Sequence, residues 1–140
     1  MASRPKKPHK VWMYVPPKPL KPKVPEDLKA EVTAKAEALI EEWKPRFIKE
    51  PPKGHRFNYI VDLYTKWFRS YFYFCAKYAS PGPTAISPFF ETRSARMEYV
   101  GERRFKLAYM RHTGEWIEVE RGLTVNACIE AIRRDPYYQP

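Results

Sequence analysis

The stretch that decides the fold is RFNYIVDLYTKWFRSYFYFCAKY, residues 56–78. Large side chains, many of them aromatic, alternate along it with the period of two that is typical of β-strands. The alternation breaks near Trp67 and then resumes, which predicts two strands paired as a hairpin. Because an isolated two-stranded ribbon is unstable in water, further strands or a helix must cover its apolar face. In the first strand the side chains expected to face that cover are Phe57, Tyr59, Val61 and Leu63.

A helix is predicted before the ribbon, over residues 25–43. Pro25 suits the first helical position, where a missing amide hydrogen costs nothing. From Leu28 to Trp43, apolar residues recur every three or four positions and form one stripe. Pro45 is expected to end the helix.

Three shorter strands and a second helix are predicted after the ribbon. The segments SARMEYV, RFKLAYM and EWIEVE are separated by turns at Gly101-Glu102 and Thr113-Gly114. Thr124 is a good N-cap for the last helix, and Asp135-Pro136 closes it. A run of strands with helices segregated to the ends indicates an α+β fold. We expect an antiparallel twisted sheet of about five strands, with the first helix packed across it and a short C-terminal helix.

Residues 1–24 differ from the rest of the chain. They hold seven of the 26 Lys and Arg residues and none of the 16 Asp and Glu residues, so they carry +7 of the net charge of +10. Proline at the density found here favours an extended chain. The sequence therefore predicts an extended basic arm at 1–24 and a single α+β domain at 25–140. Within the arm, Trp12 and Tyr14 belong to the apolar segment VWMYV, which we expect to dock on a surface.

Several function classes lack their usual signatures. The two cysteines, Cys75 and Cys128, are too few for a disulfide scaffold or a thiolate zinc site, and they are expected to be buried thiols. The three histidines have no metal-binding spacing, and no glycine-rich phosphate loop is present. No apolar span of membrane length occurs either. We therefore expect a cytoplasmic protein that is not an enzyme and has no cofactor, metal site or membrane partner.

Asp62 is the residue that an enzymatic alternative would use. With Glu98 or Glu118 in one cleft of the sheet, its carboxylate would transfer protons or bind a divalent ion. In that case Asp62 would line a concave pocket for a small molecule. An ordinary strand acid would instead pair with a neighbouring cation. The candidate cations are Lys66, Arg69 and Arg111.

Basic residues interleaved with aromatic residues form the stronger pattern. Tyr64, Tyr71 and Tyr73 are expected on the sheet face away from the helix, with Arg69 and Lys77 on the side of the last two. Tyrosine rings stack on bases while cations hold phosphates, an arrangement that suits single-stranded RNA. This pattern predicts a nucleic-acid-binding or ribonucleoprotein-associated protein, with RNA favoured over DNA. A second basic cluster is predicted from Arg93, Arg96, Arg103, Arg104 and Arg111. The predicted contacts are Lys6, Lys7, Lys10, Lys18, Lys21, Lys23, Arg69, Tyr71, Tyr73, Arg93, Arg96, Arg103, Arg104 and Arg111.

Two other interpretations of the same residues stay open. The tyrosine face is either exposed or a second core layer covered by VWMYV, which would remove the stacking surface. The protein is alternatively an interaction subunit whose proline-rich arm docks, through Trp12 and Tyr14, on an acidic protein surface or on a second copy in a homo-oligomer. Proline-rich segments lose little conformational entropy on binding, which makes them good ligands for aromatic grooves.

Short motifs along the domain resemble a bacterial family of small uncharacterised proteins, a domain of unknown function. The motifs are Ala95 to Val100, Tyr109-Met110-Arg111, Gly114-Glu115-Trp116 and Asp135-Pro136-Tyr137. The resemblance covers about residues 25–138 and omits the arm. It implies the layout of helix, antiparallel meander and helix, but no activity and no catalytic residue. The layout also resembles that of double-stranded-RNA-binding domains, which have three strands and a lysine cluster that this chain lacks.

Overall fold

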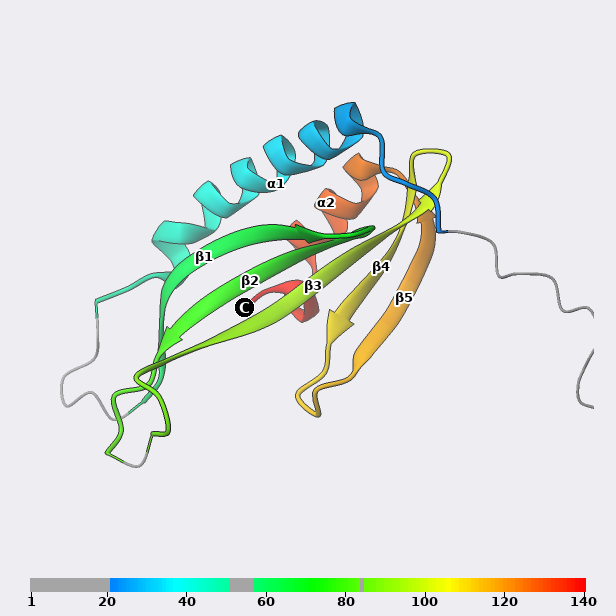
Figure 1. Ribbon diagram of the computed structural model, residues 1–140. Coiled ribbons are helices and arrows are strands. Elements are labelled where there is room, and N and C mark those ends of the chain that lie inside the picture. Colours follow the sequence, from blue (N-terminus) through cyan, green and yellow to red (C-terminus); the bar gives the residue numbers. More distant parts are fainter. Residues whose placement is uncertain (1–20, 51–56, 84) are drawn as a thin grey trace, which may run out of the picture.

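The computed structural model describes residues 21–50, 57–83 and 85–140. Five antiparallel strands form one sheet in the order β1-β2-β3-β4-β5, and helices α1 and α2 lie on the same side of it (Figure 1). The predicted α+β fold is confirmed. The elements are α1 (Glu26–Phe47), β1 (Tyr59–Phe68), β2 (Tyr71–Ala79), β3 (Phe89–Gly101), β4 (Arg104–Met110), β5 (Trp116–Leu123), α2 (Val125–Arg134) and the short 3-10 helix η1 (Pro136–Tyr138).

Helix α1 differs from its prediction at both ends. Pro25 is the N-cap residue, with extended backbone, and the helix begins one residue later. Pro45 lies inside the helix, which ends at Phe47 rather than before the proline. A proline in the last turn removes only one backbone hydrogen bond, and the Ile48 amide still donates to the Lys44 carbonyl at 2.8 Å. The predicted apolar stripe is buried along its whole length, including Leu28 and Trp43.

Strand β1 does not alternate as predicted. The pairing of β1 with β2 shifts register between Ile60 and Asp62, so Val61 is an extra residue. Ile60 and Leu63 therefore both pack toward the core, although they are three residues apart. Phe57 precedes the strand and is 74% exposed, which makes its assignment to the core face wrong.

The core lies between the helices and one face of the sheet. Buried side chains at alternate positions of the three middle strands form this face, and they are Phe72, Phe74, Ala76, Ala95, Met97, Phe105 and Leu107. We call this surface the helix face and the opposite surface of the sheet the far face. Because side chains alternate along a strand, the residues between these core positions point to the far face.

The closing segment behaves as its sequence predicts. The Thr124 hydroxyl accepts a hydrogen bond from the Ala127 amide at 3.2 Å and caps α2. Asp135 ends α2, and its carboxylate accepts from the Tyr137 amide at 3.0 Å to begin η1. Tyr138 is thereby buried in the core. Within the described ranges neither long helix has the length and apolarity that a membrane span requires.

Candidate nucleic-acid interface

Five side chains from β2, β3 and β5 form one aromatic–cation cluster on the far face: Tyr71, Tyr73, Arg93, Arg96 and Trp116. The rings of Tyr71 and Tyr73 stack with centroids 6.1 Å apart, and Trp116 lies 5.9 Å from Tyr73. The Arg93 guanidinium lies 4.4 Å from the Tyr73 ring. The Arg96 guanidinium lies 5.2 Å from Tyr71 and 4.8 Å from Trp116. Each cation is thus within cation–π distance of an aromatic face.

A β-bulge brings the two arginines of the cluster together. Arg93 and Arg96 are three residues apart, so regular alternation would put them on opposite faces. Arg96 pairs with Tyr73, but Arg93 pairs with Cys75, because the β2–β3 register shifts between Phe74 and Cys75. The extra residue turns both guanidinium groups to the far face.

Trp116 was not among the predicted binding residues. Its place in the cluster depends on the pairing of β4 with β5, in which it opposes Met110. That pairing contains two register shifts, so no count along the sequence aligns Trp116 with β2. Ala108 opposes Arg96 on one side and Glu118 on the other, and its small side chain leaves space on the far face for the arginine. The sequence signal that could have identified Trp116 is the motif Gly114-Glu115-Trp116, in which an aromatic residue directly follows a turn.

Lysines form ion pairs with the acidic residues that lie beside the cluster. Lys21 Nζ donates to the Tyr71 hydroxyl at 2.7 Å and lies 3.5 Å from a Glu98 carboxylate oxygen. The hydrogen bond to Tyr71, followed by the attraction of Glu98, raises the pKa of Lys21. Lys106 lies 3.9 Å from Glu98 and 3.5 Å from Glu118. These acids are therefore occupied by lysines and do not neutralise the arginines.

The two arginines make no ion pair with any residue in the described part of the chain. No carboxylate oxygen of that part lies within 4.0 Å of Arg93 or Arg96. The Arg96 Nε is in addition buried without a hydrogen-bond partner there. Buried donors are almost always paired, so an unpaired one inside a cation cluster points to a missing acceptor.

Exposure separates the members of the cluster. Tyr73 is only 7% exposed because Arg93 and Trp116 lie against it, so the expectation that its ring is open for stacking is wrong. Tyr73 forms the floor of the cluster. Arg93 is exposed, Tyr71, Arg96 and Trp116 are half-buried, and these four present the accessible surface. Tyr64 also lies on the far face, opposite Cys75, and burial raises its pKa.

The remaining arginines do not form the single basic cluster that was predicted. Arg103 lies in the turn between β3 and β4, where its guanidinium is 3.2 Å from Asp27 of α1. Arg104 donates to a backbone carbonyl of β5. Arg111 follows β4, in the loop before β5. The prediction failed because Arg103 and Arg104 lie at one end of β4 and Arg111 lies at the other.

Two predicted contacts, one of the sheet face and one of the arm, lie at the end of the sheet. Arg69 is in the tight turn between β1 and β2, with φ of 56°, and its guanidinium lies 5.2 Å from the Phe68 ring. The expectation that it shares the strand face of Tyr71 is therefore wrong. Lys23 is exposed just before α1. The other predicted contacts of the arm fall outside the described residues, and they are Lys6, Lys7, Lys10, Trp12, Tyr14 and Lys18.

The structure does not assemble the predicted acid pair. Asp62 lies on the edge strand β1 beside a cavity of about 290 Å³ that Glu41 and Lys44 of α1 also line. Its carboxylate accepts from the Leu63 amide at 2.9 Å, and no cation suggested from the sequence pairs with it in the described ranges. Glu98 is on β3 and bound by lysines. Among residues 21–50, 57–83 and 85–140, no three His, Cys, Asp or Glu side chains converge as metal ligands would.

Comparison with known proteins places the chain by family alone. Neither a curated protein nor a solved structure matches it. One family model matches residues 23–139, which is nearly the whole chain apart from the arm, and that family has no assigned function. The helix-then-meander layout seen here agrees with the resemblance noted from the short motifs. The chain therefore belongs to the family described as "Domain of unknown function (DUF3024)".

Proposed function

We propose that this protein binds single-stranded nucleic acid, RNA in preference to DNA, and does so without catalysis. The observation that carries the proposal is the aromatic–cation cluster of the far face. Its arginines lack acidic partners among the described residues, and its aromatic rings lie between them. Sheets that bind single strands combine these two features, because rings stack on unpaired bases while cations hold the backbone.

The accessible members of the cluster have different roles in the proposed binding. Trp116 and Tyr71 offer ring surface to bases, and each stacked base contributes about 1–3 kcal/mol. Arg96 lies between these rings, 4.8 Å and 5.2 Å away, and its guanidinium group, which pairs with no carboxylate of the described residues, would bind a phosphate or base oxygen. A duplex hides the faces of its bases in the stack, so this surface suits unpaired strands.

The arm supplies attraction without sequence readout. With +7 of the net charge and no acidic residue, residues 1–24 would contact phosphates as a set of point charges. Lysines bound to phosphates release counterions, so the affinity should fall steeply with salt. The arm would therefore set the salt dependence of binding, and the cluster would set the preference for unpaired bases.

Titration of a fluorescent single-stranded RNA with the full chain at several salt concentrations tests the proposal. Trp116→Leu and Arg96→Gln should each weaken binding about tenfold or more and leave the fold intact. Arg121→Gln, an exposed change on β5 with the same loss of charge, is the matched control and should change affinity little. Replacing Lys6, Lys7, Lys10 and Lys18 by Gln should lower the salt slope by about 0.7 per lost contact.

Two results would contradict this function. One is an affinity that does not respond to salt. The other is a loss of binding in Arg96→Gln no larger than in the Arg121→Gln control together with no loss in Trp116→Leu, which would mean that net charge alone attracts RNA. A duplex competitor of the same sequence should displace the strand poorly.

A protein-interaction role is the second candidate, and a separate surface favours it. Ile86, Phe89 and Phe90 are 105%, 47% and 38% exposed near the connection of β2 to β3, which leaves large apolar side chains accessible at this end of the sheet, away from the cluster. If the protein pairs with a second copy through these exposed side chains, light scattering without RNA should give twice the monomer mass. Phe89→Ser should then restore the monomer. A monomeric wild-type chain would contradict self-association.

A further inference from the structure

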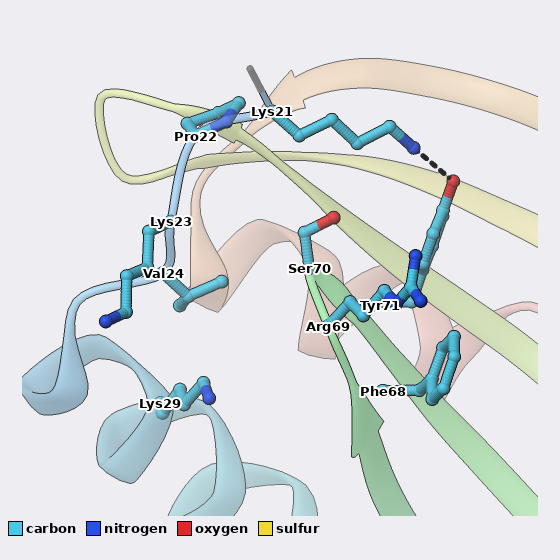
Figure 2. A pocket seen from close by; sticks show the side chains of 9 residues that line it. All are labelled: Lys21, Pro22, Lys23, Val24, Lys29, Phe68, Arg69, Ser70 and Tyr71. Carbon is cyan, nitrogen blue, oxygen red and sulfur yellow. Dashed lines mark hydrogen bonds between the residues drawn. The ribbon is translucent and has the colours of Figure 1, made fainter.

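A cavity of about 540 Å³ lies at the end of the sheet beside the cluster. Its walls come from three parts of the chain: the segment before α1, the first turns of α1, and the turn between β1 and β2 (Figure 2). Tyr71 belongs both to this cavity and to the aromatic–cation cluster, so the two surfaces are continuous. The lining residues are Lys21, Pro22, Lys23, Val24, Lys29, Phe68, Arg69, Ser70 and Tyr71.

The cavity is strongly cationic. Four of its lining residues are Lys or Arg and none is acidic. Lys23 and Arg69 make no ion pair with any residue of the described ranges. Lys21 is held at Tyr71 and Glu98, and Lys29 lies 3.9 Å from Glu26. Two cations are thus unpartnered and two more lie within reach of a ligand, which favours an anion.

Ser70 supplies an uncharged donor in the same cavity. It is 6% exposed, and its hydroxyl has no hydrogen-bond partner among the described residues. In Figure 2 it lies in the middle of the lining, between Val24 on one side and Tyr71 on the other. A buried hydroxyl without a partner costs free energy unless a ligand or water satisfies it.

Apolar side chains form the rest of the cavity wall. Pro22 and Val24 form one wall, and the Phe68 ring, which is 54% exposed, lies on the opposite side beside Arg69 (Figure 2). Exposed phenylalanine next to a guanidinium group offers a planar ligand a stacking surface. The volume lies in the range of small-ligand pockets. A ligand with an anionic group and a flat ring would use all of these features.

We propose that this cavity binds the terminal nucleotide of a single strand through its phosphomonoester, while the adjoining bases lie on the far face. The inference rests on the proposed function and adds recognition of a chain end. Arg69 and the Ser70 hydroxyl donate to the phosphate, the Lys23 side chain, whose amine points away from them in Figure 2, turns in on binding to join them, and Phe68 contacts the base. A terminal monoester carries more negative charge and more free oxygens than an internal diester, so a site with several donors discriminates between them.

The test compares one short RNA sequence with three kinds of ends: a 5′-phosphate, a 3′-phosphate, and hydroxyls at both ends. The full chain should bind one of the phosphorylated forms about tenfold or more tightly than the hydroxyl form. Whichever end is preferred gives the direction of the strand across the far face. Lys23→Gln and Arg69→Gln should abolish the preference, and Ser70→Ala should reduce it.

The controls are Lys49→Gln and Arg121→Gln, exposed residues outside the cavity with matched losses of charge, and they should retain the preference. Circular dichroism of each variant establishes that it folds. Equal affinity for the three RNA forms overturns end recognition and leaves the proposed function standing. Failure of every RNA form to bind overturns both proposals. Loss of the preference in the control variants as well as in the cavity variants also overturns the site.

Discussion

The two faces of the sheet are built from neighbouring residues of the same strands, yet they are physically opposite. On the helix face, Phe72 and Met97 have no exposed surface, and the side chains around them are apolar. One residue away on the far face, Tyr71 and Arg96 are half-buried, polar at their tips and in contact with one another. Stability therefore depends on one set of alternate residues, and the proposed nucleic-acid binding depends on the other.

The difference teaches where a substitution should act. Apolar packing contributes in proportion to the area removed from water, so the helix face holds most of the folding free energy. Exposed cation–π contacts each contribute only about 0.5–1 kcal/mol to the free energy of folding. The cluster on the far face therefore adds little to stability compared with the core. Changes on the helix face should lower stability, and changes on the far face should lower binding.

Phe72→Ala should show the largest effect on stability. The side chain is fully buried against Trp67 and Phe74, with ring centroids 4.8 Å and 5.5 Å away, so truncation leaves a cavity. We expect a loss of about 3–5 kcal/mol in the free energy of unfolding, measured by urea denaturation. Tyr71→Ala, one residue along on the far face, should cost less than half as much. Equal losses of stability in the two variants would contradict the inference that the helix face holds most of the folding free energy.

Alkaline pH should distinguish the two buried cysteines. Burial in the core raises the pKa of Cys128 to about 12. Burial also raises the pKa of Cys75, but the nearby Arg93 and Lys66 oppose that effect. A thiol whose pKa is raised by folding keeps its proton where the unfolded chain has lost it. Its contribution is therefore complete below about pH 9, the ordinary thiol value, and is lost as the pH rises toward the folded value.

The expected result is a free energy of unfolding that falls by up to about 1.4 kcal/mol per pH unit between pH 9 and 12 because of Cys128. Cys128→Ala should flatten this slope, and Cys75→Ala should flatten it less. Urea denaturation at several pH values measures both. The account of Cys128 fails if its removal leaves the slope unchanged.

Arg103→Gln and Arg96→Gln should have the smallest effects on stability and should differ in binding. Arg103 joins the β3–β4 turn to α1 through Asp27 and Glu31, and an exposed ion pair of this kind contributes about 0.2–1 kcal/mol. Arg96→Gln removes two cation–π contacts and should lower stability by about 1–2 kcal/mol. Only Arg96→Gln should weaken RNA binding strongly. A binding defect of the same size in Arg103→Gln would point to charge alone.

The sequence predicts much of the fold because the local signals agree with one another. The apolar stripe from Leu28 to Trp43 and the Thr124 cap each identify an element, and alternation in β2 separates Phe72 and Phe74 from Tyr71. These patterns depend only on the period of the element. They need no knowledge of the neighbouring strands.

The interface was less predictable because it depends on register. Bulges in β1 and between β2 and β3 place Ile60 and Arg93 on faces that alternation does not assign to them. Trp116 reaches the cluster through strand pairings that are set by tertiary packing. No sequence pattern identifies Ser70 and Arg69. The turn between β1 and β2 brings them beside the segment before α1, where they line the cavity.

The most direct measurement uses three tryptophans as built-in reporters of the two faces. Trp43 of α1 is buried in the core, Trp67 donates its indole hydrogen to Thr33 at 3.0 Å on the helix side, and Trp116 lies in the far-face cluster. Indole N–H signals of ¹⁵N-labelled full chain, assigned with single Trp→Phe variants, are followed while single-stranded RNA is added. A large shift of the Trp116 signal with nearly unchanged Trp43 and Trp67 signals is the predicted result. An unchanged Trp116 signal at saturating RNA, or larger shifts at Trp43 and Trp67, would contradict binding on the far face.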